Sequence, residues 1–356
     1  MRTGWLRTLA VTTLLTAACG SVHAPAGNAA SASRIPTPPT ASAPITRYLA
    51  LVTLRGSNQL VVRDITDISH AFTVSKVGTT SAPVFISATE LSYADGSGLV
   101  RTPLAGSPAT RVVSSTEGVL LFAWSPDGTT LAYVAGASNT SELHLVTAGQ
   151  DRKVSSMPAI LGGCETQSCA YGSDFRLSYS PDGRYISLMQ SFGGPNFRLW
   201  TSDGKLLDSN PPGSGYRMSA WSGSSLYFVD ANGVAVWRDR VISSFLPRVS
   251  WIRPKASPSG GQIVYAAFDK SGWTHIYVVD TNTTKVRELK QARREPVFLT
   301  SRYVWYQGER ACTAADVCDS SLPVTASGKT YIYDLRDGIE SESIITSAAD
   351  VWPHGA

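Results

Sequence analysis

From residue 47 onward, apolar and polar positions alternate in short runs that are separated by turn-forming residues. The clearest examples are "LLFAWSPDGTTLAYVAG" from Leu120 and "FRLSYSPDGRYISLMQS" from Phe175. Alternation with a period of two predicts strands, and Ser-Pro-Asp-Gly between two such runs predicts a tight hairpin turn. No stretch shows a helical period, so the pattern predicts an all-β fold.

The hairpin unit recurs along the chain. Six copies begin their turns at Ser87, Ser125, Ser180, Ser222, Ser257 and Thr300. Their spacings are 38, 55, 42, 35 and 43 residues, and a period near 40 with four strands per unit is typical of a propeller blade. The copy at Ser222 lacks Pro-Asp, and the copy at Thr300 keeps almost none of the motif. The repeat predicts blades of four strands, a to d, in a meander.

The two ends of the repeat region complement each other. The segment from Arg47 supplies strands b, c and d without a strand a, whereas "ADVWPHGA" at the end fits a strand a and the start of its turn. Because an open ring would leave strand edges unpaired, we expect Val351 and Trp352 to complete the first blade. Residues 46–356 are thus predicted to form a seven-bladed β-propeller, with Trp352 buried against blade 7 and Val351 paired with Leu49–Thr53.

The repeat is similar to one known kind. "WSPDG", followed by an alternating strand, an Ile-Tyr-Val-type third strand and a basic fourth strand, resembles the TolB-type, WD-like propeller repeat of bacterial envelope proteins. The resemblance covers about 300 residues and is strong in two blades. It implies an envelope propeller with a binding role, although a fold does not determine a function.

The N-terminus has the pattern of an export signal. Two arginines flank Trp5, and "TLAVTTLLTAA" follows as an uncharged stretch too short to cross a bilayer. The next residues, "LLTAACGS", resemble a bacterial lipobox, which implies cleavage before Cys19 and a lipid on that residue. Thr16 departs from the usual Leu, and an ordinary secretory signal cut near residues 24–26 is the alternative.

These features predict the organisation and location of the chain. We expect a signal peptide at residues 1–18, and a lipidated cysteine with a disordered tether, rich in Ala, Ser, Pro and Thr, at residues 19–45. Lipid chains would anchor the protein on the outer side of the bacterial cytoplasmic membrane. Without lipid it would be periplasmic or secreted.

Composition narrows the class of partner. The chain is 43% hydrophobic and 16% charged, which is ample for a core. The net charge of +4 falls to about +2 once the leader is removed, and no basic stripe is present, which argues against nucleic acid. We expect a monomer that binds another envelope protein and that meets the membrane only through its anchor.

The other four cysteines form two local pairs, Cys164 with Cys169 and Cys312 with Cys318. In an oxidising compartment, this spacing favours two short-range disulfides. The alternative is a metal site, but these gaps are wider than the two-residue spacing of zinc knuckles. We therefore expect two disulfides and neither a metal nor another cofactor.

Both cysteine pairs lie in insertions that lengthen the repeat. In a meander, the b–c loops and the d-to-a connections lie on one face of the ring, so both insertions are expected there. Enlarged loops on a rigid scaffold are common binding sites. The candidate binding face comprises Tyr171, Phe192, Trp273, Glu309 and Arg310. The alternative is that these insertions are neutral decoration.

Signatures of catalysis are weak. No Gly-x-Ser-x-Gly elbow is present. His144 and His275 recur at equivalent third-strand positions, but on different blades. Asp127 and Asp182 belong to turns, where aspartate has a structural role.

Two classes of function follow. The preferred one is a non-enzymatic interaction platform with no catalytic residues. The alternative is an enzyme, or a protein that binds a small molecule or glycan, with its ligand at the central channel. A ring of acidic or histidine side chains at the channel mouth would favour this alternative.

Overall fold

The computed structural model describes residues 47–57, 59–66, 74–76, 83–95, 97–105, 108–114, 118–137, 140–158, 175–190, 196–209, 217–313 and 325–354. The regular secondary structure of these residues is β-strand alone. None of them forms a helix with the length and apolar character needed to cross a membrane. The predicted signal peptide, Cys19 and the predicted tether lie outside the described residues.

The strands form seven four-stranded antiparallel sheets, as the repeat predicts. In the order a to d, blade 1 is β28 (Ile345–Trp352), β1 (Leu49–Leu54), β2 (Leu60–Asp64) and β3 (Val74–Lys76); blade 2 is β4 (Val84–Ser87), β5 (Glu90–Asp95), β6 (Gly98–Pro103) and β7 (Thr110–Ser114); blade 3 is β8 (Val119–Trp124), β9 (Thr130–Ala137), β10 (Thr140–Thr147) and β11 (Gln150–Pro158); blade 4 is β12 (Phe175–Tyr179), β13 (Tyr185–Gln190), β14 (Asn196–Thr201) and β15 (Leu206–Ser209). Blade 5 is β16 (Arg217–Ser222), β17 (Ser225–Asp230), β18 (Gly233–Arg238) and β19 (Val241–Pro247); blade 6 is β20 (Ile252–Ala256), β21 (Gln262–Phe268), β22 (Thr274–Asp280) and β23 (Val286–Gln291); blade 7 is β24 (Arg293–Phe298), β25 (Tyr303–Ala311), β26 (Thr325–Asp334) and β27 (Glu340–Glu342).

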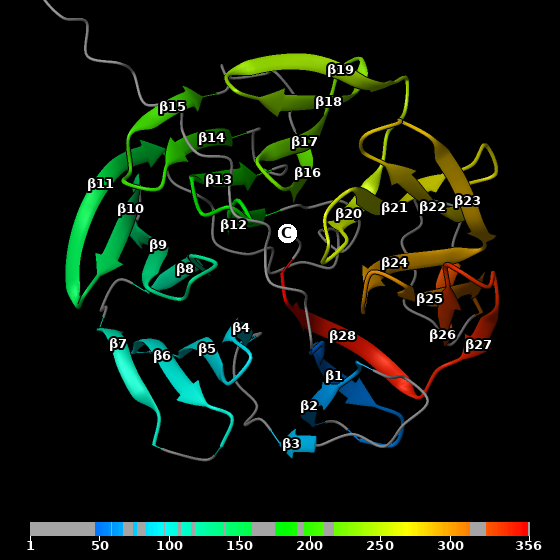
Figure 1. Cartoon of the computed structure of the whole chain (residues 1–356), viewed down its shortest axis with the longest axis horizontal. Coiled ribbons are helices and arrows are strands. Elements are labelled where there is room, and N and C mark those ends of the chain that lie inside the picture. The colour runs from blue at the N-terminus through cyan, green and yellow to red at the C-terminus, as the bar shows by residue number, and fades with distance from the viewer. Residues whose placement is uncertain are drawn as a thin grey trace, which may run out of the picture. The chain divides into compact units, whose positions relative to one another are not determined.

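The C-terminal strand closes the ring. Figure 1 shows β28, in red, beside β1, in blue, with strand a of each blade nearest the centre. Val351 pairs with Ala50 and Trp352 with Leu49, which confirms the predicted closure. The closing strand is longer than the sequence pattern suggested, because it begins at Ile345.

The predicted position of Trp352 is wrong. Val351 packs in the cluster shared by blades 7 and 1, where it meets Trp305. Trp352 is half-buried and packs on the opposite side, against a cluster of blades 1 and 2 that includes Phe85. The reason is strand geometry: neighbouring residues point to opposite faces, so both cannot face blade 7.

Packing between blades forms the core. The buried apolar side chains in the described part of the chain gather in clusters, and each cluster joins two adjacent blades. Three tryptophans also donate indole N–H bonds across blade boundaries. Trp221 donates to Ser187 Oγ at 2.8 Å, Trp251 to the Met218 carbonyl at 2.8 Å, and Trp305 to the Ile345 carbonyl at 3.0 Å. Each blade is therefore stabilised mainly by its neighbours.

The Ser-Pro-Asp-Gly turns have the structural role expected from the sequence. Ser125 Oγ donates to Asp127 Oδ1 at 2.5 Å and accepts a bond from Thr130 N at 2.9 Å. Gly128 has a φ of 68°, a conformation that a glycine adopts without strain. The bond from Ser125 is the main cause that lowers the pKa of Asp127. The turn at Ser180 repeats these bonds, so both aspartates serve their own turns.

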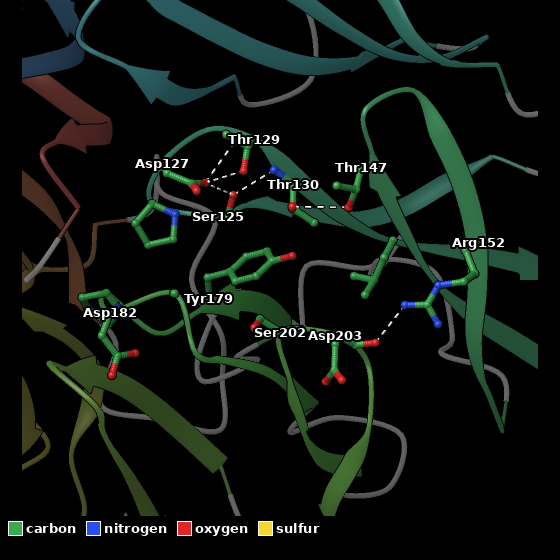
Figure 2. Close-up of a pocket in the computed structure, with 14 residues that line it drawn as sticks. Ser125, Asp127, Thr129, Thr130, Thr147, Arg152, Tyr179, Asp182, Ser202 and Asp203 are labelled. Carbon is green, nitrogen blue, oxygen red and sulfur yellow. Dashed lines mark hydrogen bonds between the residues drawn. The ribbon is translucent and has the colours of Figure 1, made fainter. Parts of the chain in front are cut away.

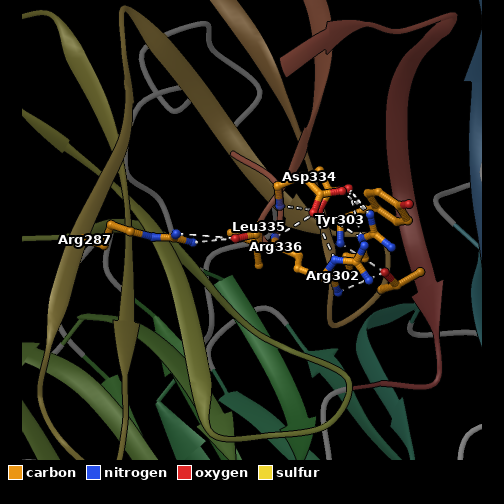
Figure 3. A network of polar contacts seen from close by, with 8 residues as sticks. Arg287, Arg302, Tyr303, Asp334, Leu335 and Arg336 are labelled. Carbon is orange, nitrogen blue, oxygen red and sulfur yellow. Dashed lines mark hydrogen bonds and ion pairs between the residues drawn. The ribbon is translucent and has the colours of Figure 1, made fainter. Parts of the chain in front are cut away.

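Blade 7 lacks the motif, and a different network holds its turn (Figure 3). Thr300 Oγ1 accepts bonds from Arg302 N and Tyr303 N at 3.1 and 3.0 Å. The Arg302 guanidinium reaches over to Asp334 and joins the a–b turn to the c–d turn, with Nε 2.9 Å from both carboxylate oxygens. This ion pair takes the place of the missing Pro-Asp-Gly.

We expect Asp334→Asn to lower the melting temperature by a few degrees at pH 7. The bond from Arg302 holds the pKa of Asp334 well below its ordinary value of 3.8. A lowered folded-state pKa contributes stability above pH 3.8 that is lost as the pH falls through the folded-state pKa. Urea midpoints of the variant and the wild type should therefore converge in acid. Asp337→Asn is the control, because it removes a more exposed partner of Arg302. A fall in melting temperature as large as that of Asp334→Asn would contradict the role given to the Arg302–Asp334 pair.

Candidate functional site

The structure brings together three of the five residues predicted for the binding face. Trp273 precedes β22 on blade 6, and Glu309 and Arg310 end β25 on blade 7. Thr274 donates to Glu309 from its backbone N at 2.8 Å and from Oγ1 at 2.6 Å. Glu309 therefore fastens blade 6 to blade 7, while Arg310 is exposed and Trp273 is half-buried.

The remaining predictions for this face fall mostly outside the described residues. Tyr171, Phe192, Cys164, Cys169 and Cys318 belong to that undescribed part. Cys312 directly follows β25 and is disulfide-bonded, whereas the two predicted pairings stay predictions. Among the described residues, no group of three or more His, Cys, Asp or Glu side chains could hold a metal ion.

A cleft opens at the same end of the ring, between blades 7 and 1. Its volume is about 540 Å³, and it is lined by Arg55, Gln307, Arg310, Ser327, Gly328, Lys329, Thr330, Glu342 and Thr346. We call it the 7–1 cleft. It holds three cationic side chains and a single carboxylate.

The carboxylate of Glu342 organises the 7–1 cleft. Its Oε1 accepts a bond from Arg55 at 2.8 Å and its Oε2 accepts one from Lys329 at 2.8 Å. The bonds from Lys329 and then Arg55 are the main causes that lower the pKa of Glu342, and the bond to Glu342 raises the pKa of Lys329. Glu342 and Lys329 are therefore charged at neutral pH, and the described lining of the cleft holds more basic side chains than carboxylates.

Apart from Thr346 on β28, the other polar groups of the cleft come from the hairpin β25–β26. The Gln307 side-chain oxygen is buried and has no hydrogen-bond partner among the described residues. The ladder shifts register between Gln307 and Glu309. At that shift Gly308 and Gly328 face each other so closely that a Cβ on Gly328 would lie 3.2 Å from the Gly308 carbonyl oxygen.

Sequence reasoning missed Arg55, Gln307 and Lys329. Any polar residue on a short strand fits the alternating pattern, so the pattern does not distinguish these three. Ring closure brings Arg55 of blade 1 next to Gln307 and Lys329 of blade 7. The available signal was the glycine in each of "QGER" and "ASGK", which lie on β25 and β26, because a glycine inside a strand often marks a bulge or a close approach of two backbones.

The inner strands carry charged side chains that are paired with one another. Arg253 Nη1 lies 2.9 Å from Glu295 Oε1, between blades 6 and 7. Asp350 Oδ2 accepts a bond from Phe85 N at 2.7 Å, and His354 Nε2 lies 2.9 Å from the same oxygen. The described residues here are mixed in sign, so they do not make the ring of acids or histidines that would favour a channel enzyme.

The two recurring histidines lie apart, on β10 and β22. His144 Nδ1 lies 3.0 Å from Asp151, and His275 contacts Glu288 at 3.1 Å and Asp269 at 3.2 Å. Each therefore forms local polar contacts on its own blade, and the fold does not bring the two together as ligands of one site.

Comparisons with known proteins place the fold. No protein-family model matches the chain, and no curated sequence does so either. Among solved structures, one from an analysis of two prolyl endopeptidases has a TM-score of 0.55 at 12% identity; the match covers 85% of this chain and 51% of that one. An oligogalacturonate lyase in complex with manganese has a TM-score of 0.52 at 14% identity, with 85% of each chain covered.

A further match is a "putative TolB" of Agrobacterium tumefaciens, with 17% identity, 66% of this chain and 83% of that chain covered, and a TM-score of 0.38. At these identities the similarity concerns the fold alone. The prolyl endopeptidase chain is about twice the length of the matched region. The comparisons and the sheet order together identify the chain as a seven-bladed β-propeller, a fold that enzymes also use.

Proposed function

We propose that the chain is a non-enzymatic lipoprotein of the bacterial cell envelope whose propeller binds a partner protein at the 7–1 cleft. The observation that carries the proposal is the positive excess of this cleft, next to the extended hairpin β25–β26. The export-signal pattern and the lipobox-like "LLTAACGS" support the location. A partner with an acidic segment would complement this surface.

The polar groups of the cleft fit a polypeptide better than a simple anion. Arg310 and Lys329 are exposed cations that a partner's carboxylate can approach. The Gln307 oxygen is an acceptor without a partner in the described structure, and a peptide N–H would supply the missing donor. An acidic peptide segment offers both groups at once.

The double charge reversal Arg310→Glu with Lys329→Glu tests the proposal. We expect at least about a tenfold loss of partner capture, because two attractive contacts become repulsive. The measurement is cross-linking pull-down from native envelope, followed by titration of the captured protein. Binding by the wild type should also weaken as the salt concentration rises.

The matched control is Arg240→Glu with Lys285→Glu. It makes the same change of net charge at exposed cations in the c–d turns of blades 5 and 6, at the other end of the ring. Equal loss of capture in both double variants, or no loss in the cleft variant, would contradict partner binding at the 7–1 cleft.

A second candidate is an enzyme, or a protein that binds a small molecule or glycan, with its ligand at the central channel. A polar ligand in the channel would contact charged groups of the inner strands, such as the Arg253–Glu295 pair, although these groups do not form a ring of acids or histidines. A thermal-shift screen with sugars and carboxylates tests this function. Stabilisation of the wild type that is lost in Arg253→Gln would support it over the first.

A further inference from the structure

A second cleft lies among the turns at the opposite end of blades 3 and 4 (Figure 2). Its volume is about 510 Å³. The a–b turns of both blades and the c–d turn of blade 4 border it, and we call it the turn cleft. The proposed function makes no use of it.

The hydroxyl of Tyr179 is the group in this cleft that the fold does not explain. The side chain lines the cleft, is 8% exposed, and has no hydrogen-bond partner for its oxygen in the described part of the chain. Figure 2 shows the ring between the turn at Ser125 and the segment at Ser202. A buried hydroxyl without a partner costs stability, so a ligand that bonds to it would recover a lost interaction.

The carboxylates around Tyr179 differ in what they already bind. Asp127 uses Oδ1 for Ser125 and Thr129, and its Oδ2 has no partner among the described residues. Asp203 accepts a bond from Thr201 at Oδ1, and a hydrogen bond from the Lys205 backbone also lowers the pKa of Asp203. Both turn aspartates can therefore accept further hydrogen bonds.

The other two charged groups of the cleft are already engaged. Both oxygens of Asp182 are taken, by Ser180 and Arg184. Arg152 donates to the Asp203 carbonyl at 2.8 Å. Three aspartates and one arginine line the cleft, so its local charge is negative.

Part of the cleft wall is apolar. Pro126, Pro181 and Leu145 line it together with the ring of Tyr179. The Tyr179 oxygen lies beneath the surface of the cleft, since it has almost no accessible area. A ligand bonds to this oxygen only when the side chains that cover it move aside.

We propose that the turn cleft binds a primary amine carried on an alkyl stem, either a lysine side chain of a polypeptide or a free alkyl diamine. The ammonium donates to Asp127 Oδ2 and to the Tyr179 oxygen, and the methylene groups lie against the prolines. An ammonium carries three donors and no acceptor, which matches a site rich in acceptors. Long cationic side chains also bury their stems on apolar surface.

Calorimetric titration of the full chain tests the proposal with two amines and one isostere. The probes are 1,5-diaminopentane, the capped peptide Gly-Lys-Gly, and the same peptide with norleucine in place of lysine. We expect both amines to bind and the norleucine peptide not to bind. Tighter binding of the lysine peptide would assign the site to a polypeptide, and tighter binding of the diamine would assign it to a small molecule.

Tyr179→Phe removes the hydroxyl alone and keeps the ring. We expect it to weaken amine binding about tenfold, because it removes one hydrogen bond to a charged group, while the melting temperature stays equal or rises. Asp280→Asn, at an exposed turn of blade 6, is the matched carboxylate control and should leave binding unchanged. Failure of both amines to bind, equal binding of the norleucine peptide, or unchanged affinity in Tyr179→Phe would overturn the proposal.

Discussion

Removal of residues 348–356 should lower the free energy of unfolding by several kcal/mol. The truncation deletes the partners of Val52, Leu51, Ala50 and Leu49 in the ladder between β28 and β1. It also removes buried Val351 from the cluster between blades 7 and 1. Deletion of large buried groups typically costs 2–5 kcal/mol at one site, and here an exposed strand edge adds to the loss.

Calorimetry of the truncated and full chains measures this loss as a lower melting temperature. A shift of about 2–4 °C accompanies each kcal/mol in domains of this size or somewhat smaller. The control ends the chain after Pro353, which keeps β28 and removes the contacts of His354 with Asp350 and with the Trp352 ring. If the longer deletion melted together with the full chain, closure by β28 would not stabilise the ring.

Replacing Trp305 with alanine should cost about 3–5 kcal/mol, the usual range for a fully buried tryptophan. Its side chain is 2% exposed, and it packs between blade 7 and the closing strand. Trp305→Phe should cost much less, because the Ile345 carbonyl also accepts a bond from Thr330 Oγ1 at 2.6 Å and so keeps a partner.

Urea unfolding of both Trp305 variants measures the difference. Trp273→Ala is the surface control, since this half-buried tryptophan joins none of the core clusters of the described chain. A loss for Trp305→Ala as small as that for Trp273→Ala would show that the junction of blades 7 and 1 contributes little to stability.

The architecture could be predicted because its signals are local. Turn residues such as Ser125 and Asp127 lie two positions apart and bond to each other. Strand alternation is likewise a property of neighbouring residues. The missing first strand and the spare last strand then left one way to close the ring. Alternation along the strand places Val351 and Trp352 on opposite faces, but it does not indicate which of the two faces blade 7.

The details that sequence could not provide depend on distant residues. Arg302 replaces the missing turn motif by pairing with Asp334, which is 32 positions away. Arg55 and Glu342 meet across 287 positions. Such pairs produce no periodic signal in the sequence, because a charged residue at any exposed strand position fits the same alternation. The insertions in the sequence indicated the candidate face, but the 7–1 cleft beside that face was not predicted.

The position of β1 determines how the propeller responds to a pull on the chain. β1 is the first strand, yet it lies inside its sheet, with hydrogen bonds to β28 on one edge and to β2 on the other. Tension on the residues before Arg47 acts along β1 and loads both ladders in shear, so their bonds must break together. An outermost first strand would instead peel away one bond at a time. A pull on the N-terminal side would therefore load a strand that is paired on both of its edges.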